Sequence, residues 1–276
     1  MTKRRNTKRK IGIVIIAFSI FLCVFAYVSN NWIQNTRYMI SSPKVNQSIT
    51  IVHLSDLHGK QFGKNNINLL KNIKEENPDM IVFTGDLIDA YRNENINESV
   101  DLLQQLSQYA PVYYIRGNHE YNSSRYQEIM ERLHQIKGDF YILDGDYINA
   151  NIKEQKISIL GLDRDKKGVI EKFISEDGYK IILDHYAENF IDNANLSQLE
   201  ADLVLAGHAH GGQWRLPIIG GVYSPGQGIN PKYYQGMIEK GGSIQIISRG
   251  LGNSTFPLRL FNRPEVITIV IEQDIR

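Results

Sequence analysis

The sequence predicts an α/β fold in which two mixed β-sheets face each other and helices cover their outer faces, a four-layer αββα sandwich preceded by one transmembrane helix. Three observations predict it: an uncharged run near the N-terminus, β-branched runs alternating with helical patterns over residues 48–206, and a C-terminal part that is β-rich without helices. The chain has 276 residues, 42% of them apolar, which is enough to bury one large core.

The composition excludes several classes of protein. An apolar fraction this ordinary excludes a chain with many membrane spans and a disordered chain. The single cysteine, Cys23, excludes a disulfide framework and any zinc or iron–sulfur site built from cysteines. Residues 1–55 hold eight cationic side chains and no acidic one, which leaves 23 positive and 30 negative charges in residues 56–276. With a formal charge of −7, this part is expected to show no specific binding to nucleic acid.

The N-terminal segment indicates a membrane anchor. Six cationic side chains within residues 3–10 precede residues 11–28, which carry no charge. As a helix this run would be about 27 Å long, close to the hydrocarbon thickness of a bilayer. The excess of positive charge before the anchor predicts that residues 1–10 are cytoplasmic and that the body of the chain faces outward. The polar residues 29–47 are predicted to form a stalk, and residues 48–276 one folded domain.

Two other interpretations of this segment stay open. A cleaved signal peptide needs a small-residue cleavage site, and residues 26–29 provide a poor one. The pair Arg4-Arg5 is similar to a twin-arginine export signal, although the polar Asn6 and Thr7 follow it where apolar residues are usual. An uncleaved anchor needs only the length and the flanking charges, and we favour it.

The first half of the body alternates strands with helices. Residues 48–55 form a short β-branched run, which predicts a strand. Apolar residues at positions 67, 69, 70 and 73 predict a helix over residues 65–76 that ends before Pro78. The same patterns then predict strands at 80–84 and 112–116 and helices at 96–109 and 123–135.

The second half becomes richer in strands. Residues 147–151 and 156–161 have the pattern of a hairpin. Buried strands are predicted at the apolar runs 180–183 and 203–206, and further strands at the β-rich runs 241–248 and 265–271. Early alternation followed by late β pairing favours two facing sheets with helices outside them.

Side chains that can bind metal ions follow five of the predicted strands. The carboxyl ends of strands line the ligand crevice in open α/β sheets, so these side chains are expected at one edge. Residues i and i+2 of an extended segment project to the same side, so Asp56 and His58 can bind one ion, and His208 and His210 can face one site. The full set is Asp56, His58, Asp86, Asn118, His185, His208 and His210.

The predicted ligand set contains two carboxylates, one amide and four imidazoles, and no thiolate. Such donors suit Mn, Fe, Zn or Co, and they exceed what one ion needs. Two ions that share a carboxylate account for the number of donors. Ion pairs of this kind, about 3.5–4 Å apart, clamp a phosphoryl group during displacement at phosphorus. The sequence therefore predicts two divalent cations as cofactors and a phosphoester as substrate.

Five sequence blocks resemble those of the calcineurin-like metallophosphoesterases. They are D-x-H at residues 56–58, G-D-x-x-D at 85–89, G-N-H-E at 117–120, the isolated His185, and G-H-x-H at 207–210, in the order that the family has. Residues 211–213, 248–252 and 262–265 are similar to a bacterial subfamily whose phosphoesterase domain is exported or anchored in a membrane. The resemblance implies that residues 48–276 are a metal-dependent phosphoester hydrolase, with phosphodiesterase or pyrophosphatase activity expected.

The resemblance also implies a role for each motif residue. Asp56, His58 and His210 would hold one ion, Asn118, His185 and His208 would hold the second, and Asp86 would bridge both. His119 and Asn118 would be the catalytic residues, with His119 beside the phosphate as a proton donor or electrostatic stabiliser. A hydroxide held between the two ions would attack phosphorus, because the ions lower the pKa of bound water.

Several other polar residues have both a functional and a structural interpretation. Arg116 and Arg249 can bind a phosphate if they point into the crevice, and otherwise they form salt bridges. Asp89 is expected to cap a helix or to lie next to the ligands. His53 lies inside a predicted strand and is expected to pack in the core, whereas His134 lies in a predicted helix and is expected to face solvent.

The expected protein is a monomeric enzyme, held in the cell membrane by one helix, that hydrolyses a lipid-linked or cell-wall phosphoester at the outer face. Related sequences are associated with a UDP-2,3-diacylglucosamine-type lipid pyrophosphate, but that substrate is cytoplasmic and the predicted topology opposes it. The alternative from another class is a scaffold that keeps the fold without catalysis and binds a partner through the crevice. The intact set of candidate ligands favours the enzyme.

Overall fold

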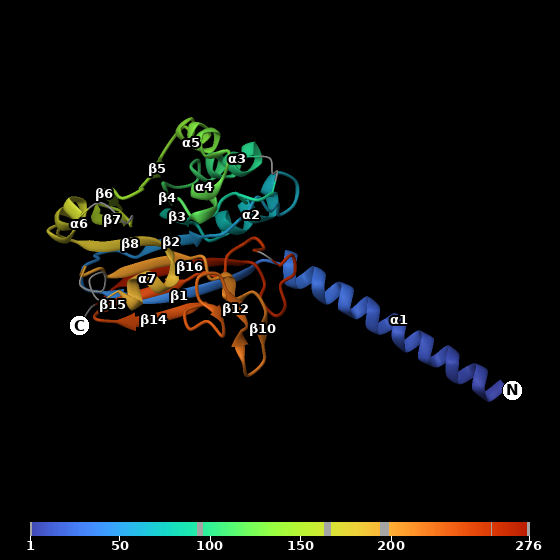
Figure 1. The fold of residues 1–276 in the computed structure, drawn as a ribbon. Helices are drawn as coiled ribbons and strands as arrows, with labels where there is room; N and C mark the ends of the chain where they lie inside the picture. Colours follow the sequence, from blue (N-terminus) through green and yellow to red (C-terminus); the bar gives the residue numbers. More distant parts are fainter. Residues whose placement is uncertain (1, 93–95, 163–166, 194–198, 255, 275–276) are drawn as a thin grey trace.

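Two six-stranded mixed sheets stack face to face in the computed structural model, and helices cover their outer faces (Figure 1). This arrangement confirms the predicted four-layer architecture. The structure describes residues 2–92, 96–162, 167–193, 199–254 and 256–274, without the side chains of residues 2–9 and 167.

The first sheet contains the strands predicted in the early, alternating half of the chain. In spatial order it consists of β1 (Gln34–Ser42), β16 (Glu265–Gln273), β2 (Ile49–Leu54), β3 (Met80–Thr84), β4 (Val112–Ile115) and β5 (Phe140–Ile142). β2 to β5 are parallel, whereas β16 runs antiparallel to β2 and parallel to β1. The carboxyl ends of β2, β3 and β4 therefore lie at one edge.

The second sheet also has a parallel centre, and each of its two edge strands is antiparallel to its neighbour. In spatial order it consists of β14 (Gly236–Lys240), β15 (Ser243–Ile247), β9 (Leu203–Gly207), β8 (Tyr179–Tyr186), β7 (Gln155–Gly161) and β6 (Tyr147–Ile152). β6 and β7 form the predicted hairpin, and β14 pairs antiparallel with β15. β7, β8, β9 and β15 are parallel.

Successive residues of the central strands point to opposite faces of their sheet. In β2, Ile51 packs between the two sheets, and Val52 packs under the helices. In β8, Ile181 packs between the sheets and Ile182 on the outer face. Both faces are buried, which is why these strands read as continuous apolar runs and not as an alternating pattern.

The helices cover the two outer faces. α2 (Ile67–Glu75), α3 (Ile96–Leu106) and α5 (Tyr126–His134) pack on the first sheet, and α6 (Lys167–Ile174) and α7 (Ala187–Asp192) on the second. The three predicted helices are present with shorter bounds. The predicted start at residue 65 falls in a 3₁₀ turn (η1, Lys64–Asn66), because Asn65 and Asn66 adopt left-handed backbone angles. The helix predicted from residue 123 begins at Tyr126, and a separate α4 (Asn118–Asn122) precedes it.

The predicted anchor is a long helix, α1 (Thr2–Asn31), which extends away from the sheets (Figure 1). Among the described residues, its segment Lys10–Asn31 is long and apolar enough to cross a membrane. The prediction of a polar stalk at residues 29–47 is wrong for residues 34–42, which form β1 and pair with β16 along their whole length. β1 is an edge strand with one face in solvent, so polar residues alternate along it and conceal the strand.

Two small hairpins lie in the chain between β9 and β14, two strands of the second sheet. They consist of β10 (Arg215–Leu216) with β11 (Gly220–Gly221), and β12 (Tyr223–Ser224) with β13 (Gly228–Ile229). A 3₁₀ turn, η3 (His210–Gly212), connects the end of β9 to them. In Figure 1 these hairpins project from the body beside the junction with α1.

Removal of β1 is expected to destabilise the domain. A chain that begins at residue 45 exposes the edge of β16 and loses the buried Ile40, whereas a chain that begins at residue 32 keeps both. We expect the midpoint of thermal unfolding to be about 5–10 °C lower for the shorter chain, since 1 kcal/mol shifts it by about 2–4 °C in a domain of this size. Equal midpoints in differential scanning calorimetry would show that β1 adds no stability.

Candidate metal centre

The seven predicted ligands come together where strand ends of both sheets meet. β2, β3 and β4 deliver their residues from the first sheet, and β8 and β9 from the second. His185 lies in a β-bulge, because the pairing of β8 with β9 shifts between Asp184 and Tyr186. A bulge re-aims the side chain of its extra residue, and here it turns His185 toward the first sheet.

The backbone around the ligands is turned and not extended. Five of the seven predicted ligands have a positive φ between 48° and 65°: Asp56, His58, Asp86, His208 and His210. Left-handed backbone costs energy in residues other than glycine, although Asp and His tolerate it better than most, and it concentrates at functional sites. The expectation that i and i+2 share a side is therefore met only for Asp56 and His58. His208 and His210 point into two adjacent groups.

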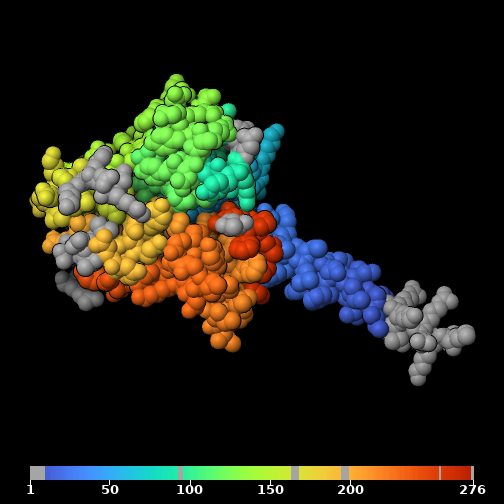
Figure 2. All heavy atoms as spheres, in the orientation of Figure 1, coloured from blue at the N-terminus to red at the C-terminus, as the bar shows by residue number. Residues whose placement is uncertain are grey.

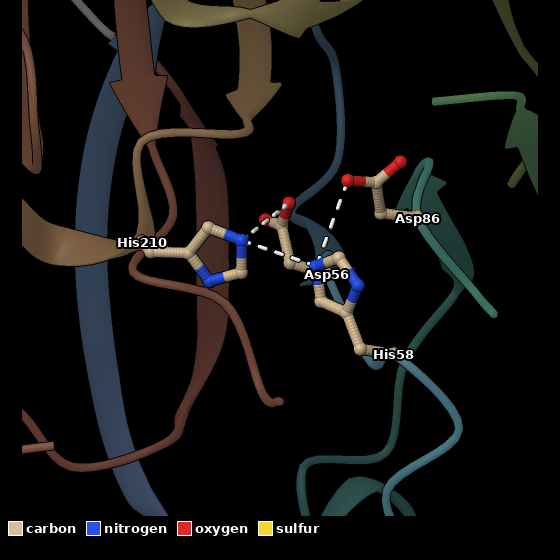
Figure 3. A group of neighbouring side chains, drawn as sticks. All are labelled: Asp56, His58, Asp86 and His210. Carbon is tan, nitrogen blue, oxygen red and sulfur yellow. Dashed lines mark hydrogen bonds and ion pairs between the residues drawn. The ribbon is translucent and has the colours of Figure 1, made fainter. Parts of the chain in front are cut away.

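The first group of donors contains Asp56, His58, Asp86 and His210, whose donor atoms lie within 4.8 Å of one another. His58 Nε2 lies 3.1 Å from His210 Nε2 and 3.6 Å from Asp86 Oδ2, and His210 Nε2 lies 3.6 Å from Asp56 Oδ1. Figure 3 shows the four side chains pointing toward a common centre. All four are buried.

The second group contains Asp86, His185 and His208, together with Asn118. His185 Nε2 lies 2.9 Å from Asn118 Oδ1, 3.2 Å from His208 Nδ1 and 3.4 Å from Asp86 Oδ2. The other ring nitrogen, Nδ1, lies 2.8 Å from the Thr84 carbonyl oxygen, which only accepts, so Nδ1 donates there. In a neutral His185 the lone pair is then on Nε2, which faces two oxygen acceptors, Asn118 Oδ1 and Asp86 Oδ2. Such a cluster of acceptors needs a cation at its centre.

The two donor groups fit a pair of divalent cations. One oxygen, Asp86 Oδ2, lies within 3.6 Å of His58 and within 3.4 Å of His185, so it adjoins both groups. Nitrogen and oxygen donors without a thiolate suit Mn, Fe, Co or Zn. The second nitrogen of His185 is held by a backbone carbonyl, which is the usual support of a metal-binding imidazole.

Burial and one charge pair set the protonation of these groups. Burial lowers the pKa of His58 to about 4 and that of His208 to about 3, so both rings are neutral and can act as ligands. Burial also opposes charge on His185 and Asp86, but their mutual attraction outweighs it. The attraction between the two groups raises the pKa of His185 to about 10 and holds the pKa of Asp86 well below its usual value. Without a metal ion, the proton on His185 supplies the positive charge.

Glu120 holds the two ligand-bearing loops together, and sequence reasoning assigned it no role. Its buried carboxylate accepts three backbone N–H bonds, from Asp86 (2.9 Å), Gly117 (2.7 Å) and Ile88 (3.1 Å). These bonds join the loop after β3 to the start of α4. The available signal was its position, since an acid three residues after the N-cap of a helix accepts from the N-cap N–H.

Two glycines allow the loops to approach closely. A Cβ on Gly117 would lie 2.1 Å from Asp86 Oδ1, and a Cβ on Gly85 would lie 2.5 Å from the Gly117 nitrogen. Gly85 also has a φ of 88°, which side chains disfavour. Side chains at these two positions would therefore keep the loops of Asp86 and Asn118 apart.

Arg259 supports the first group from behind and was also missed. It is fully buried and donates to the carbonyl oxygens of Gly252 and Arg249, while its Nη2 lies 3.5 Å from His210 Nδ1. Burial lowers the pKa of Arg259 to about 10, which leaves it cationic at neutral pH. It stands 49 residues after His210, in a loop with no recognisable motif, so the sequence offers no signal for it.

His119 lies beside the first group. Its backbone N–H donates to Asp86 Oδ1 at 2.8 Å, and its ring meets the His58 ring edge-on at 4.4 Å. The Ala90 N–H donates to His119 Nδ1 at 3.0 Å, so the neutral ring carries its proton on Nε2. Asp89 Oδ1 lies 3.5 Å from the same Nδ1 and also accepts from the Tyr91 N–H, so Asp89 is both a local cap and a neighbour of the site.

The two predicted substrate arginines have different surroundings. Arg116 lines a cavity of about 530 Å³ together with Asn118 and His185, and it forms an ion pair of 2.5 Å with Asp144. Arg249 is not among the residues that line this cavity. It is buried, and its guanidinium pairs with Glu265 at 2.7 Å, so the structure gives it a structural partner.

The remaining histidines have the surroundings expected for them. His53 is fully buried in β2, and its Nε2 lies 2.8 Å from Thr84 Oγ1. Burial lowers the pKa of His53 to about 3. His134 is exposed at the end of α5.

Comparison with known proteins gives matches over most of the chain. Residues 49–212 match the family model described as "Calcineurin-like phosphoesterase". The chain is 29% identical over 262 residues to "Uncharacterized metallophosphoesterase YkuE" of Bacillus subtilis (strain 168), covering 89% of this chain and 88% of the relative. It is 26% identical over 250 residues to "Phosphodiesterase YaeI" of Escherichia coli (strain K12), covering 87% and 88%. It is 24% identical over 248 residues to "Transmembrane protein with metallophosphoesterase domain" of Danio rerio, covering 84% and 55%.

Substitution of Glu120 by Gln is expected to weaken metal binding by about 10–100-fold, the usual effect of losing a support behind the ligands. The amide keeps one acceptor but presents its NH₂ to backbone N–H groups that need an acceptor. Affinity is measured by titration of the metal-free chain with Mn²⁺. Glu131→Gln, at an exposed glutamate of α5, is the matched control and should bind as the unchanged chain does. Equal affinity in both variants would contradict this role of Glu120.

Metal binding to the metal-free chain is expected to release about one proton at pH 8. His185, with a pKa of about 10, must lose its Nε2 proton before that nitrogen can coordinate a cation. The apparent affinity should therefore rise with pH up to about pH 10. Calorimetric titration in buffers of different ionisation enthalpy measures the release. His185→Ala should abolish it and His134→Ala should not; a release that survives in His185→Ala would contradict the assignment.

Proposed function

The chain belongs to the calcineurin-like phosphoesterase family, and on that premise we propose that it is a phosphodiesterase that uses two divalent cations. One observation carries the proposal: two groups of buried donors share Asp86 beside a cavity of about 530 Å³. The printed name of one relative, a phosphodiesterase, supports the choice of a diester over a monoester.

In this proposal the two donor groups divide the ions between them. Asp56, His58 and His210 hold the first ion, Asn118, His185 and His208 hold the second, and Asp86 bridges both. Two divalent cations, when bound, polarise the phosphoryl oxygens and lower the pKa of water. The chain supplies the enclosure, because all these ligands except Asn118 are almost completely buried.

His119 is the residue we assign to the leaving group. With Nδ1 accepting from the Ala90 N–H, Nε2 carries the proton that can hydrogen-bond to an oxygen of the substrate. Asp89 Oδ1, 3.5 Å from Nδ1, is placed to accept from a protonated Nδ1 in place of the contact with the Ala90 N–H, which gives the doubly protonated ring that donates a proton to a leaving alkoxide. Arg116 faces the same cavity and is assigned to a phosphoryl oxygen.

We also propose that the enzyme works at the outer face of the cell membrane. α1 is the anchor, the cationic residues before it stay in the cytoplasm, and the domain that begins with β1 lies outside. A relative named as a transmembrane protein with the same type of domain supports this arrangement. A phosphoester in the lipid or cell-wall layer is within reach of a domain held there.

The proposed activity is tested with the full chain in detergent, loaded with Mn²⁺, on bis(p-nitrophenyl) phosphate and on p-nitrophenyl phosphate. We expect hydrolysis of the diester, and a loss of about 100-fold or more in Asp86→Asn and in His210→Ala, because each removes a proposed ligand. Asp101→Asn, an exposed aspartate on α3, is the matched control and should keep full activity. Retention of two ions without turnover of either ester would indicate a scaffold in place of an enzyme.

A further inference from the structure

The two small hairpins carry an unusual concentration of exposed apolar side chains. The exposed fractions are 108% for Ile218, 83% for Ile229, 64% for Ile219 and 38% for Leu216, and Phe261 beside them is 55% exposed. We call these five residues the hairpin patch. Among the described residues after α1, Ile67 is the one other exposed Ile or Leu. Isolated exposed apolar residues are ordinary, but a gathered set indicates a surface that meets an apolar partner.

Two hollows lie beside the residues of the hairpin patch. Leu216, Ile218 and Phe261 line the first, which joins the first hairpin to the loop of Phe261. Trp214, Tyr223, Ile229 and Phe256 line the second, of about 430 Å³, at the second hairpin. In Figure 2 this segment stands out as a lobe beside the base of α1.

The patch begins where α1 joins the domain. The Phe25 ring lies 4.8 Å from the Phe261 ring, and Asn30 Oδ1 accepts from the Arg259 N–H at 3.1 Å. Phe25 belongs to the uncharged run 11–28. Asn30, where α1 meets the domain, is five residues after Phe25, which is about 7 Å farther along the helix axis. If the uncharged run fills the apolar layer of a bilayer, Phe261 lies at the depth of Phe25, inside the edge of that layer.

The backbone of the patch is strained in a way that the fold itself does not explain. Ile218 has a φ of 74° and Phe261 a φ of 51°, which are costly angles for residues other than glycine, above all for a β-branched one. The Phe261 ring lies against Phe25, whereas Ile218 holds its side chain fully outward, where water gives no compensation. Strain of this kind points to a contact that the isolated domain lacks.

We propose that the hairpin patch inserts into the acyl layer of the bilayer that α1 crosses, so that the domain meets the membrane at two places. The inference rests on the membrane position of α1 proposed above. The occupant is phospholipid hydrocarbon, because the patch is continuous with a helix of that environment through Phe25 and Phe261. Two contacts restrict rotation of the domain about α1. They also fix the orientation of the metal centre, since His210 precedes Trp214 and the patch by a few residues.

The test measures the depth of labels in the full chain, reconstituted in vesicles of phosphatidylcholine and phosphatidylglycerol that carry a nitroxide on the acyl chain. The native Cys23, exposed on α1, takes a fluorescent label and reports the anchor. In a Cys23→Ser background, the same label is attached to Ile218→Cys or Ile229→Cys. Glu131→Cys on α5, across the sheets from the hairpins in Figure 1, is the control exposed to water.

We expect lipid nitroxide to quench the labels at Ile218→Cys and Ile229→Cys to at least half the extent seen at Cys23, with Glu131→Cys unaffected. Quenching at Cys23 but no more at the hairpins than at Glu131→Cys would overturn the proposal and leave the anchor intact. Absence of quenching at Cys23 would overturn both. Iodide in the aqueous phase serves as a second quencher. Hairpin labels that are quenched neither by lipid nitroxide nor by iodide would overturn the proposal and show that a protein, such as a second copy, covers the patch.

Discussion

The structure depends on keeping one carboxylate, that of Asp86, ionised in a place without water. A buried anion is tolerated only with opposite charge and hydrogen bonds around it. His185 on one side and His58 on the other stand within 3.6 Å of the same oxygen, and the His119 N–H holds the second oxygen at 2.8 Å. The strand ends, the close glycines and the buried Glu120 all serve to bring these groups to that carboxylate.

The sequence predicted the parts of the fold that carry a local signal. The central strands are apolar on both faces, and the ligands stand at their ends, so both were evident. β1 was missed because one face of an edge strand is wet and its polar residues resemble a linker. Glu120 and Arg259 were missed for another reason. Their contacts to the ligand-bearing segments cross 34 residues, from Glu120 to Asp86, and 49 residues, from Arg259 to His210, and no periodicity reports such contacts. For Glu120 the one local signal was its position near the start of a helix. For Arg249 the sequence left a phosphate contact and a salt bridge both open, because its partner, Glu265, comes from a different strand.

Arg259 links α1 to the candidate metal centre. On one side the Arg259 N–H donates to Asn30 at the end of α1, and on the other its guanidinium stands 3.5 Å from His210. One buried residue thus contacts both the anchor and a candidate ligand. Because Arg259 is enclosed by backbone carbonyls, this connection has few ways to bend. If α1 crosses a bilayer as proposed, this connection fixes how the candidate centre is oriented relative to it.

The pairing of β16 with both β1 and β2 also determines when the domain can form. β16 is the last strand along the chain, yet it fills the gap between the two strands that follow α1. During synthesis α1 leaves the ribosome before β16, so the proposed anchor can enter a bilayer while β16 has not yet been translated. Until then β1 and β2 lack the strand that lies between them. In the proposed outward arrangement, this order of synthesis leaves the first sheet incomplete while the chain crosses the membrane.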